Sequence, residues 1–194
     1  MLRSAKLAAT FAILGTLALA GCSSTTTGTP PASTEETTEE AAAETPEPAA
    51  PELGTRENPY PIGSTIEGPE WTVVVNSVAL GQADAVAAAN PFNEPADPGT
   101  EYIVVNYTAT YTGSDAEGSM PALAQVEYVT GAGATVSGLD KLVVAPEPAM
   151  DTVSTLYGGA SATGNVAIQV PSPVDGVLAV TPGLMADTAF VAVQ

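Results

Sequence analysis

Residues 101–111 of the chain read Glu-Tyr-Ile-Val-Val-Asn-Tyr-Thr-Ala-Thr-Tyr, and this stretch decides the fold class. Every second side chain from Ile103 to Tyr111 is apolar or aromatic, whereas the side chains between them are mostly polar. A period of two residues is typical of a β-strand that has one face in the core. We therefore predict a strand over 101–111 whose buried face carries Ile103, Val105, Tyr107, Ala109 and Tyr111.

Other apolar, β-branched stretches predict further strands at 71–80, 125–130, 135–136, 164–170, 176–181 and 188–193. Prolines and glycines fall between these stretches rather than within them, as strand hydrogen bonding requires. Only 82–89 and a single turn at 139–142 have a helical pattern. Such short strands with turns between them predict an all-β fold, an antiparallel β-sandwich, with a small barrel as the alternative. Trp71 is expected to lie in its core.

The predicted domain begins with residues 54–63, which read Gly-Thr-Arg-Glu-Asn-Pro-Tyr-Pro-Ile-Gly. Together with the stretches at 90–93, 102–107, 111–113 and 164–171, this segment resembles the DUF4352-type domain of actinobacterial surface lipoproteins. That group looks related to the MPT63-like extracellular proteins. The resemblance implies an immunoglobulin-like β-sandwich at the cell surface, with no catalytic residue and no cofactor to carry over. The immunoglobulin disulfide is missing, because the predicted domain contains no cysteine.

The N-terminus has the pattern of an export signal. Arg3 and Lys6 precede an apolar stretch from Leu7 to Ala20, which is too short to span a bilayer. The sequence then reaches Cys22 through Leu-Ala-Gly, which resembles the bacterial lipobox and implies cleavage before Cys22 and acylation of its thiol. We predict a lipoprotein signal peptide over 1–21 and a domain held outside the cell, on the outer face of the membrane. An ordinary secretory signal and an uncleaved anchor are the alternatives.

Residues 22–52 follow as a tether that is rich in Thr, Glu and Pro. The tether contains seven glutamates and no aromatic residue, Val, Ile, Leu or Met. Such a composition cannot form an apolar core, so the tether is predicted to be disordered. The immunoglobulin-like β-sandwich then takes residues 53–194, a normal length for one domain.

The charge of the chain excludes several functions. The chain has 4 Lys and Arg residues against 22 Asp and Glu residues, and it contains no histidine. Without histidine it cannot build a Ser-His-Asp triad or an HExxH zinc site. Beyond the signal peptide its cations are Arg56 and Lys141 alone, which are too few to bind a nucleic-acid backbone. Each is expected to form a local ion pair, and Lys141 follows directly after Asp140.

The longest connection between predicted strands runs from Gly81 to Gly99, and long loops are where binding residues tend to lie. The candidate partner-binding residues of this loop are Asn90, Phe92, Asn93, Glu94 and Asp97. Phe92 either anchors a partner or packs down as a plug of the loop. A second candidate contact is the turn at 114–120. The resulting hypothesis is a non-enzymatic, membrane-anchored binding module for an unidentified surface or wall-associated partner.

Two other functions stay open. The 15 carboxylates of the predicted domain allow a carboxylate-based hydrolase of cell-wall glycans, which needs two acids facing each other across a cleft. The oxygen-bearing side chains of the 81–99 loop, with Glu101 just beyond it, allow a calcium or small-ligand site, although their spacing is not that of an EF-hand. A solvated acidic surface explains the same carboxylates without catalysis. No cofactor, metal ligand or nucleic-acid partner is predicted.

Overall fold

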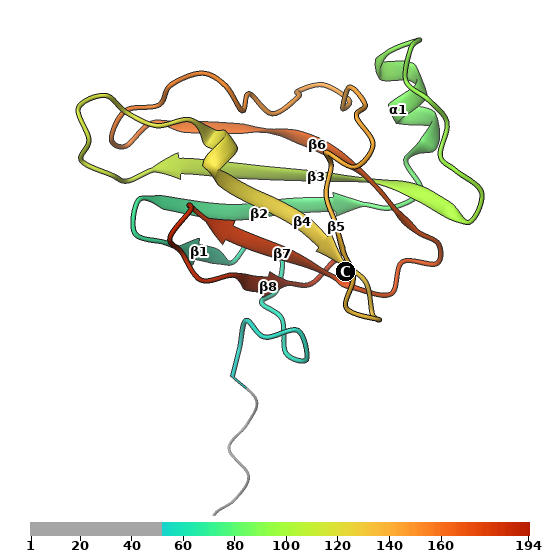
Figure 1. Cartoon of the computed structure of the whole chain (residues 1–194), viewed down its shortest axis with the longest axis horizontal. Coiled ribbons are helices and arrows are strands. Elements are labelled where there is room, and N and C mark those ends of the chain that lie inside the picture. The colour runs from blue at the N-terminus through green and yellow to red at the C-terminus, as the bar shows by residue number, and fades with distance from the viewer. Residues whose placement is uncertain (1–51) are drawn as a thin grey trace, which may run out of the picture. The chain divides into compact units, whose positions relative to one another are not determined.

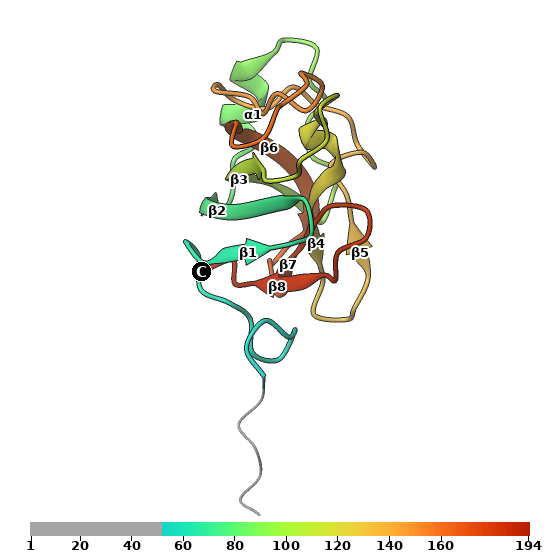
Figure 2. The same cartoon turned by 90° about the vertical axis from the view of Figure 1, so that its left-hand side faces the viewer.

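The structure is a computed structural model that describes residues 52–194, which form two antiparallel sheets packed face to face (Figure 1, Figure 2). One sheet has the order β1-β2-β3-β6, with β1 at Thr65–Glu67, β2 at Trp71–Ala79, β3 at Thr100–Tyr111 and β6 at Ser161–Pro171. The other has the order β5-β4-β7-β8, with β4 at Ala124–Val129, β5 at Thr135–Val136, β7 at Val177–Pro182 and β8 at Ala189–Val191. The helices are α1 at Ala83–Ala89 and a 3₁₀ helix, η1, at Pro121–Leu123.

This architecture confirms the predicted all-β fold, an antiparallel immunoglobulin-like β-sandwich. The barrel alternative is wrong, because no ladder joins the two sheets in the described part of the chain. The predicted signal peptide at 1–21, Cys22 and the predicted tether up to residue 51 lie outside the described residues. Between residues 52 and 194, neither helix has the length and apolar character needed to cross a membrane.

Strand β3 lies in the middle of its sheet and pairs with β2 on one side and β6 on the other. Its predicted inward face is buried, from Ile103 through to Tyr111. The ring of Tyr111 packs against that of Trp71 at the start of β2, with 5.1 Å between the ring centroids. Trp71 is fully buried, which confirms its expected place in the core.

Most predicted strands are observed within three residues of their predicted ends. Strand β1 and helix η1 were not predicted, because each is three residues long and has a single buried side chain, which leaves no periodicity to detect. The helix predicted at 82–89 is α1. The turn predicted at 139–142 is not helical, because the Asp140 carboxylate accepts a hydrogen bond from the Ser137 N–H (2.9 Å) and closes a tight turn there.

The two sheets are joined by packing and by one polar cluster. Tyr128 in β4 is fully buried, and its hydroxyl donates a hydrogen bond to the Asp175 carboxylate (3.2 Å) and accepts one from the Asp175 N–H (3.0 Å). The same carboxylate accepts a hydrogen bond from the Gly131 N–H (3.0 Å). These bonds hold the turn after β4 against the connection between β6 and β7. They therefore join β4 to the segment that connects the two sheets, without a disulfide.

The outer edge of β8 is covered by the first segment of the domain. The Tyr60 N–H donates to the Phe190 carbonyl and the Tyr60 carbonyl accepts from the Ala192 N–H, both at 2.8 Å. The Phe190 N–H donates to the Gly54 carbonyl at 2.9 Å. A covered edge cannot pair with another chain, which is how native sheets avoid aggregation.

A second, smaller core lies on the outer face of β3, at the end nearest α1. Tyr102 and Val104 are buried there together with Val86 of α1 and Ala167 of β6. Because these side chains point away from the main core, the chain must cover them from outside. The cover consists of α1, the loop that follows it and the segment 143–145.

Leu178 and Leu184 give a matched test of the main core. Leu178 in β7 is fully buried, whereas Leu184 in the turn after β7 is 72% exposed. Leu178→Ala is expected to lower the free energy of unfolding by about 2–5 kcal/mol, because it removes buried methyl groups and leaves a cavity. Leu184→Ala is expected to change it by less than about 0.5 kcal/mol. Urea unfolding followed by the fluorescence of Trp71 measures both, and equal effects would contradict the described core.

Candidate functional site

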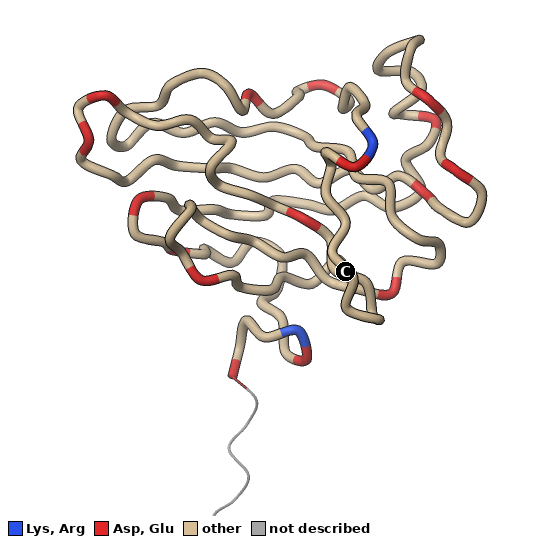
Figure 3. Tube along the Cα trace, in the orientation of Figure 1, with Lys and Arg blue, Asp and Glu red and all other residues tan. Residues whose placement is uncertain are grey.

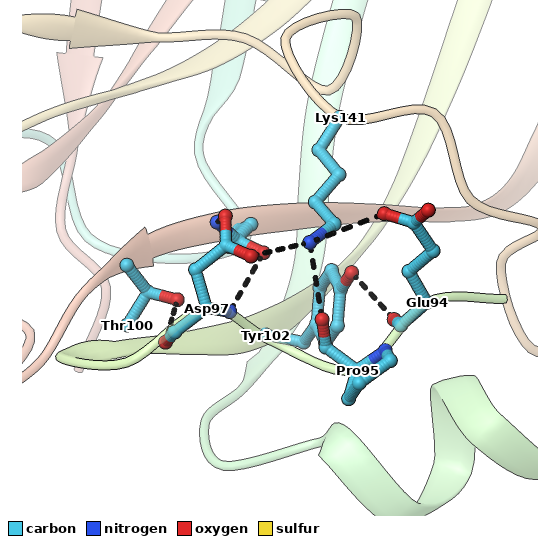
Figure 4. Close-up of polar contacts among 7 residues, drawn as sticks. Glu94, Pro95, Asp97, Thr100, Tyr102 and Lys141 are labelled. Atoms are coloured by element: carbon cyan, nitrogen blue, oxygen red, sulfur yellow. Dashed lines mark hydrogen bonds and ion pairs between the residues drawn. The ribbon is translucent and has the colours of Figure 1, made fainter.

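The loop predicted to bind a partner is held in place by one lysine from a distant segment (Figure 4). The Lys141 ammonium lies 2.8 Å from a carboxylate oxygen of Asp97 and 3.6 Å from one of Glu94. It also donates a hydrogen bond to the Pro95 carbonyl at 3.0 Å. The Lys141 side chain is only 17% exposed, so the loop wraps around it. We call these contacts the Lys141 clamp.

Asn93 fixes the same loop from its other side. Its side-chain amide donates hydrogen bonds to the Val86 carbonyl (2.7 Å) and the Val144 carbonyl (2.8 Å), and its side-chain carbonyl accepts one from the Val144 N–H (2.8 Å). A single side chain therefore joins α1, the loop and the segment 143–145. The Tyr102 hydroxyl adds a hydrogen bond to the Glu94 carbonyl (3.0 Å). The loop is a rigid cover of the second core.

The charges of the clamp stabilise one another. The hydrogen bond from Lys141 keeps the pKa of Asp97 below its ordinary value of 3.8, and a hydrogen bond from Gln169 (2.9 Å) lowers it further. The hydrogen bond to Asp97 in turn raises the pKa of Lys141 above 10.5. Both groups are therefore charged throughout the neutral range. Figure 3 shows acids spread over the described part of the chain, with Lys141 and Arg56 as its two cations.

Phe92 does not pack down as a plug of the loop. Its side chain is 90% exposed. The Asn90 side-chain oxygen accepts a hydrogen bond from the Phe92 N–H (2.9 Å), and the Asn90 carbonyl accepts one from the Asn93 N–H (3.0 Å). This turn, fixed by an asparagine side chain, projects Phe92 into solvent.

Phe92 forms an exposed apolar surface with two residues of another segment. Together with Leu142 and Val144, which are 78% and 44% exposed, it lines a shallow hollow of about 320 Å³. We call Phe92, Leu142 and Val144 the Phe92 patch. Leu142 and Val144 were not predicted as site residues. The sequence does contain a signal, the apolar run 142–144 directly after Lys141. Part of this run was interpreted as the helical turn predicted at 139–142.

A larger groove adjoins the Phe92 patch and shares Leu142 and Val144 with it. It has a volume of about 470 Å³ and lies between β4 and β6, under the segment 137–152. Most of its lining is apolar, including Val126 of β4, Leu139, and Val166 and Ile168 of β6. We call it the β4–β6 groove.

The oxygen atoms that a calcium site would use are engaged in the loop. Asp97 and Glu94 contact Lys141, and the Asn93 oxygen accepts from the Val144 N–H. In residues 52–194 no group of three or more His, Cys, Asp or Glu side chains is arranged to hold a metal ion. The two loop carboxylates, Asp97 and Glu94, have the Lys141 ammonium as their counter-charge, and this arrangement opposes the calcium alternative.

The remaining candidates lie apart from this loop. The turn at 114–120 is at the opposite end of the sheet from α1 (Figure 1), where Ser119 pairs with Leu156. The structure therefore does not bring the two predicted contacts together. Lys141 pairs with Asp97 and Glu94 rather than with its neighbour Asp140. Trp71 is fully buried and cannot stack on a sugar ring, which removes the single tryptophan of the chain from any glycan-binding cleft.

The Lys141 clamp predicts a defined pH dependence of stability. Lys141→Met is expected to lower the urea midpoint near pH 7, because Asp97 and Glu94 lose their counter-charge. For Asp97, whose pKa is lowered in the folded state, the stabilisation is lost as the pH falls below 3.8. For Lys141, whose pKa is raised, it is lost as the pH rises above 10.5. The part of the difference between wild type and variant that comes from the charge pair should therefore vanish at both extremes.

The control for this experiment is Arg56→Met, which removes the same charge at a distance from the loop. The Arg56 guanidinium donates a hydrogen bond to the Gly131 carbonyl at 3.4 Å, whereas Glu94 and Asp97 are paired with Lys141. A pH profile for Arg56→Met that matches the profile for Lys141→Met would mean that net charge, rather than the clamp, sets the effect.

No protein-family model and no curated protein matches the chain. Among solved structures, the secreted protein MPT63 of Mycobacterium tuberculosis is similar, with a TM-score of 0.50 and 17% identity over 74% of this chain and 98% of that chain. An uncharacterized β-sandwich protein of Clostridium difficile 630 has a TM-score of 0.44 and 13% identity over 70% of this chain and 94% of that chain. A conserved hypothetical protein of Bacillus anthracis has a TM-score of 0.42 and 14% identity over 68% of this chain and 94% of that chain. The similarity to MPT63 shows the β-sandwich fold, and the DUF4352-type resemblance stays a prediction.

Proposed function

We propose that this chain is an exported lipoprotein, held on the outer face of the cell membrane by acyl chains on Cys22, whose β-sandwich is a non-enzymatic binding domain. The Phe92 patch is the proposed contact with a surface or wall-associated protein. The observation that carries the proposal is the 90% exposure of Phe92 on a loop that the Lys141 clamp and Asn93 hold rigid. The proposed anchor rests on the sequence around Cys22.

An exposed apolar residue is common on protein surfaces, but this one has three unusual features. It is a large aromatic side chain, it is contiguous with Leu142 and Val144, and it projects from a turn that hydrogen bonds fix on both sides. Burying a phenylalanine side chain in an interface gains about 1.5–3 kcal/mol. A loop that is already ordered loses little entropy on binding, so more of this gain is retained as affinity.

The chemistry of the domain supports binding over catalysis. The chain contains no histidine, and Trp71 is buried. Hydrogen bonds lower the pKa of Asp97 and Asp151, whereas the general acid of a glycan hydrolase needs a raised pKa, so these two carboxylates are unsuited to that role. The carboxylate-based hydrolase therefore has less support than the binding module.

The acidic surface supports a partner other than the lipid surface itself. Residues 53–194 carry fifteen acids against two cations, a net charge of −13. Anionic lipid headgroups repel such a domain. In this proposal the acyl chains hold the protein at the membrane while its charge keeps the domain away from the lipid surface.

Phe92→Ser tests the patch, with Met185→Ser as a matched control. Met185 is 91% exposed but lies in the turn between β7 and β8. In-cell cross-linking followed by mass spectrometry is expected to recover the partner at least about tenfold less with Phe92→Ser and equally well with Met185→Ser. Unchanged recovery with Phe92→Ser would overturn the assignment of the patch. These single substitutions test the patch more specifically than a deletion of 82–98 would. The deletion would also remove the structural contacts of Val86, Asn93 and Asp97.

Cys22→Ala tests the anchor. The substituted chain is expected to appear in the medium or to remain as an uncleaved precursor, because no thiol is left to acylate. Membrane fractionation and the intact mass of the product distinguish these outcomes. A cleaved product that stays on the membrane would contradict acylation at Cys22.

A further inference from the structure

The second sheet has an open edge where β4 lines the β4–β6 groove. Strand β5 is two residues long and pairs only with Tyr128 and Val129. Within residues 52–194, no strand therefore pairs with the first part of β4, from Ala124 to Glu127, on that side, although β7 pairs with all of β4 on the other. A strand edge of this kind offers its backbone groups to an additional strand.

The backbone groups of Val126 point to this open edge. In an antiparallel strand, every second residue directs its N–H and C=O to the same side. The Thr130 N–H donates to the Ala134 carbonyl on the β5 side (2.9 Å), and the Ala124 N–H bonds to the Pro121 carbonyl, also away from β7. Val126 lies between them in the same alternation, so its N–H and C=O point into the groove.

The opposite wall of the groove is also a strand edge. On the outer side of β6, the Asn165 N–H donates to the Pro148 carbonyl (2.7 Å), and the Asn165 carbonyl accepts from the Met150 N–H (3.0 Å). By the same alternation, the backbone groups of Ala167 point to this side. Gly138 lies against the Ala167 carbonyl, where an added Cβ would be 3.4 Å away. Gly138 thus covers the Ala167 carbonyl, and the open backbone groups of the groove are those of Val126 on the β4 wall, beside apolar side chains.

We propose that the β4–β6 groove binds an extended, basic polypeptide segment that adds as a strand to the open edge of β4. Its backbone pairs with Val126, its alternate apolar side chains enter the groove, and its Lys or Arg side chains face Glu127. This inference rests on the proposed binding function and names the chemistry of the partner. Four residues of β4 form the open edge, so the segment pairs over about four to six residues.

Polypeptide explains the groove better than a lipid chain does. An acyl chain would cover the backbone groups of Val126 without forming a hydrogen bond, and burying unpaired polar groups is costly. An added strand satisfies those groups and fills the apolar space at the same time. The groove also has no cation among its described lining residues to hold a lipid headgroup.

The charges select a basic segment. Glu127 lines the groove, and Tyr107, whose pKa burial raises to about 12, stays neutral there. The nearest cation, Lys141, is already bound to Asp97 and Glu94. No positive charge in the described surroundings of the groove is therefore left to attract an acidic segment.

The same charges argue against this chain as its own ligand. The predicted tether, 22–52, carries seven glutamates and has no aromatic, Val, Ile, Leu or Met side chain to place in the groove. A second copy would bring fifteen acids and two cations against an equally acidic domain. The charge complementarity therefore points to a different, basic chain.

The test uses the full chain in neutral phosphatidylcholine nanodiscs and three peptides of eight residues. One alternates Lys with Val, one alternates Glu with Val, and one repeats the Lys-Val sequence with every second amide N-methylated. The Lys-Val peptide is expected to bind at least about tenfold more tightly than the other two and to slow hydrogen exchange over Ala124–Tyr128. Equal binding of the N-methylated peptide would overturn strand addition, and equal binding of the Glu-Val peptide would overturn the basic partner.

Variants of β4 give a second, independent reading. Val126→Pro removes an N–H that the β4–β7 ladder does not use and places a ring on the open edge, whereas Val126→Ala keeps the N–H. Val126→Pro is expected to weaken the Lys-Val peptide at least about tenfold more than Val126→Ala. If Val126→Pro does not fold, the N-methylated peptide still decides the question. A dimer of the wild-type chain that Val126→Pro dissociates would overturn the proposal in favour of a second copy.

Together, the peptide-binding and partner-recovery experiments test strand addition to β4 and the Phe92 patch separately. If Phe92→Ser abolishes partner recovery but Val126→Pro does not and no peptide binds, the binding domain stands and strand addition is wrong. If the Lys-Val peptide binds as expected while Phe92→Ser leaves partner recovery unchanged, the groove stands and the Phe92 patch is not the interface.

Discussion

The constraint on which the rest of the structure depends is that β3 has apolar side chains on both faces at one end. Ile103 and Val105 point into the space between the sheets, and Tyr102 and Val104 point out of it. A two-layer sandwich can bury only the first pair, so the chain needs a third layer over the second pair. α1, its loop and the segment 143–145 form that local layer, and the Lys141 clamp and Asn93 keep it closed. Phe92 is exposed because the cover faces solvent on its other side.

The period-two pattern predicted the fold well because it reports directly on burial. The strands from Trp71 onward, the inward face of β3 and the helix at 82–89 all depend on residues close in sequence. The site depends on contacts between distant residues, which no local pattern encodes. Lys141 reaches Asp97 across 44 residues, and Asn93 bonds to Val144 across 51. The sequence therefore predicted where the candidate loop lies. It did not predict that Asn93, Glu94 and Asp97 hold this loop in place.

The edges of the two sheets explain why one groove differs from the rest of the surface. The opening segment covers β8, a short segment bridges the middle of β6, and β1 is only three residues long. β5 is shorter still and leaves part of β4 uncovered. The exposed polar backbone thus lies beside the exposed apolar side chains of Leu139 and Leu142. That combination makes the region suited to a polypeptide, since either feature alone would fit many ligands.

The bridge between the opening segment and β8 has a mechanical consequence. Any tension that reaches the domain along the chain from residue 52 acts first on the hydrogen bonds that join Gly54 and Tyr60 to β8. Two of these bonds hold Tyr60 and one holds Gly54, whereas β3 pairs with its neighbours over almost its whole length. Under load the opening segment should peel away before the sandwich opens. The opening segment is therefore the first part of the described domain that tension would separate, and the two sheets behind it would still be packed together.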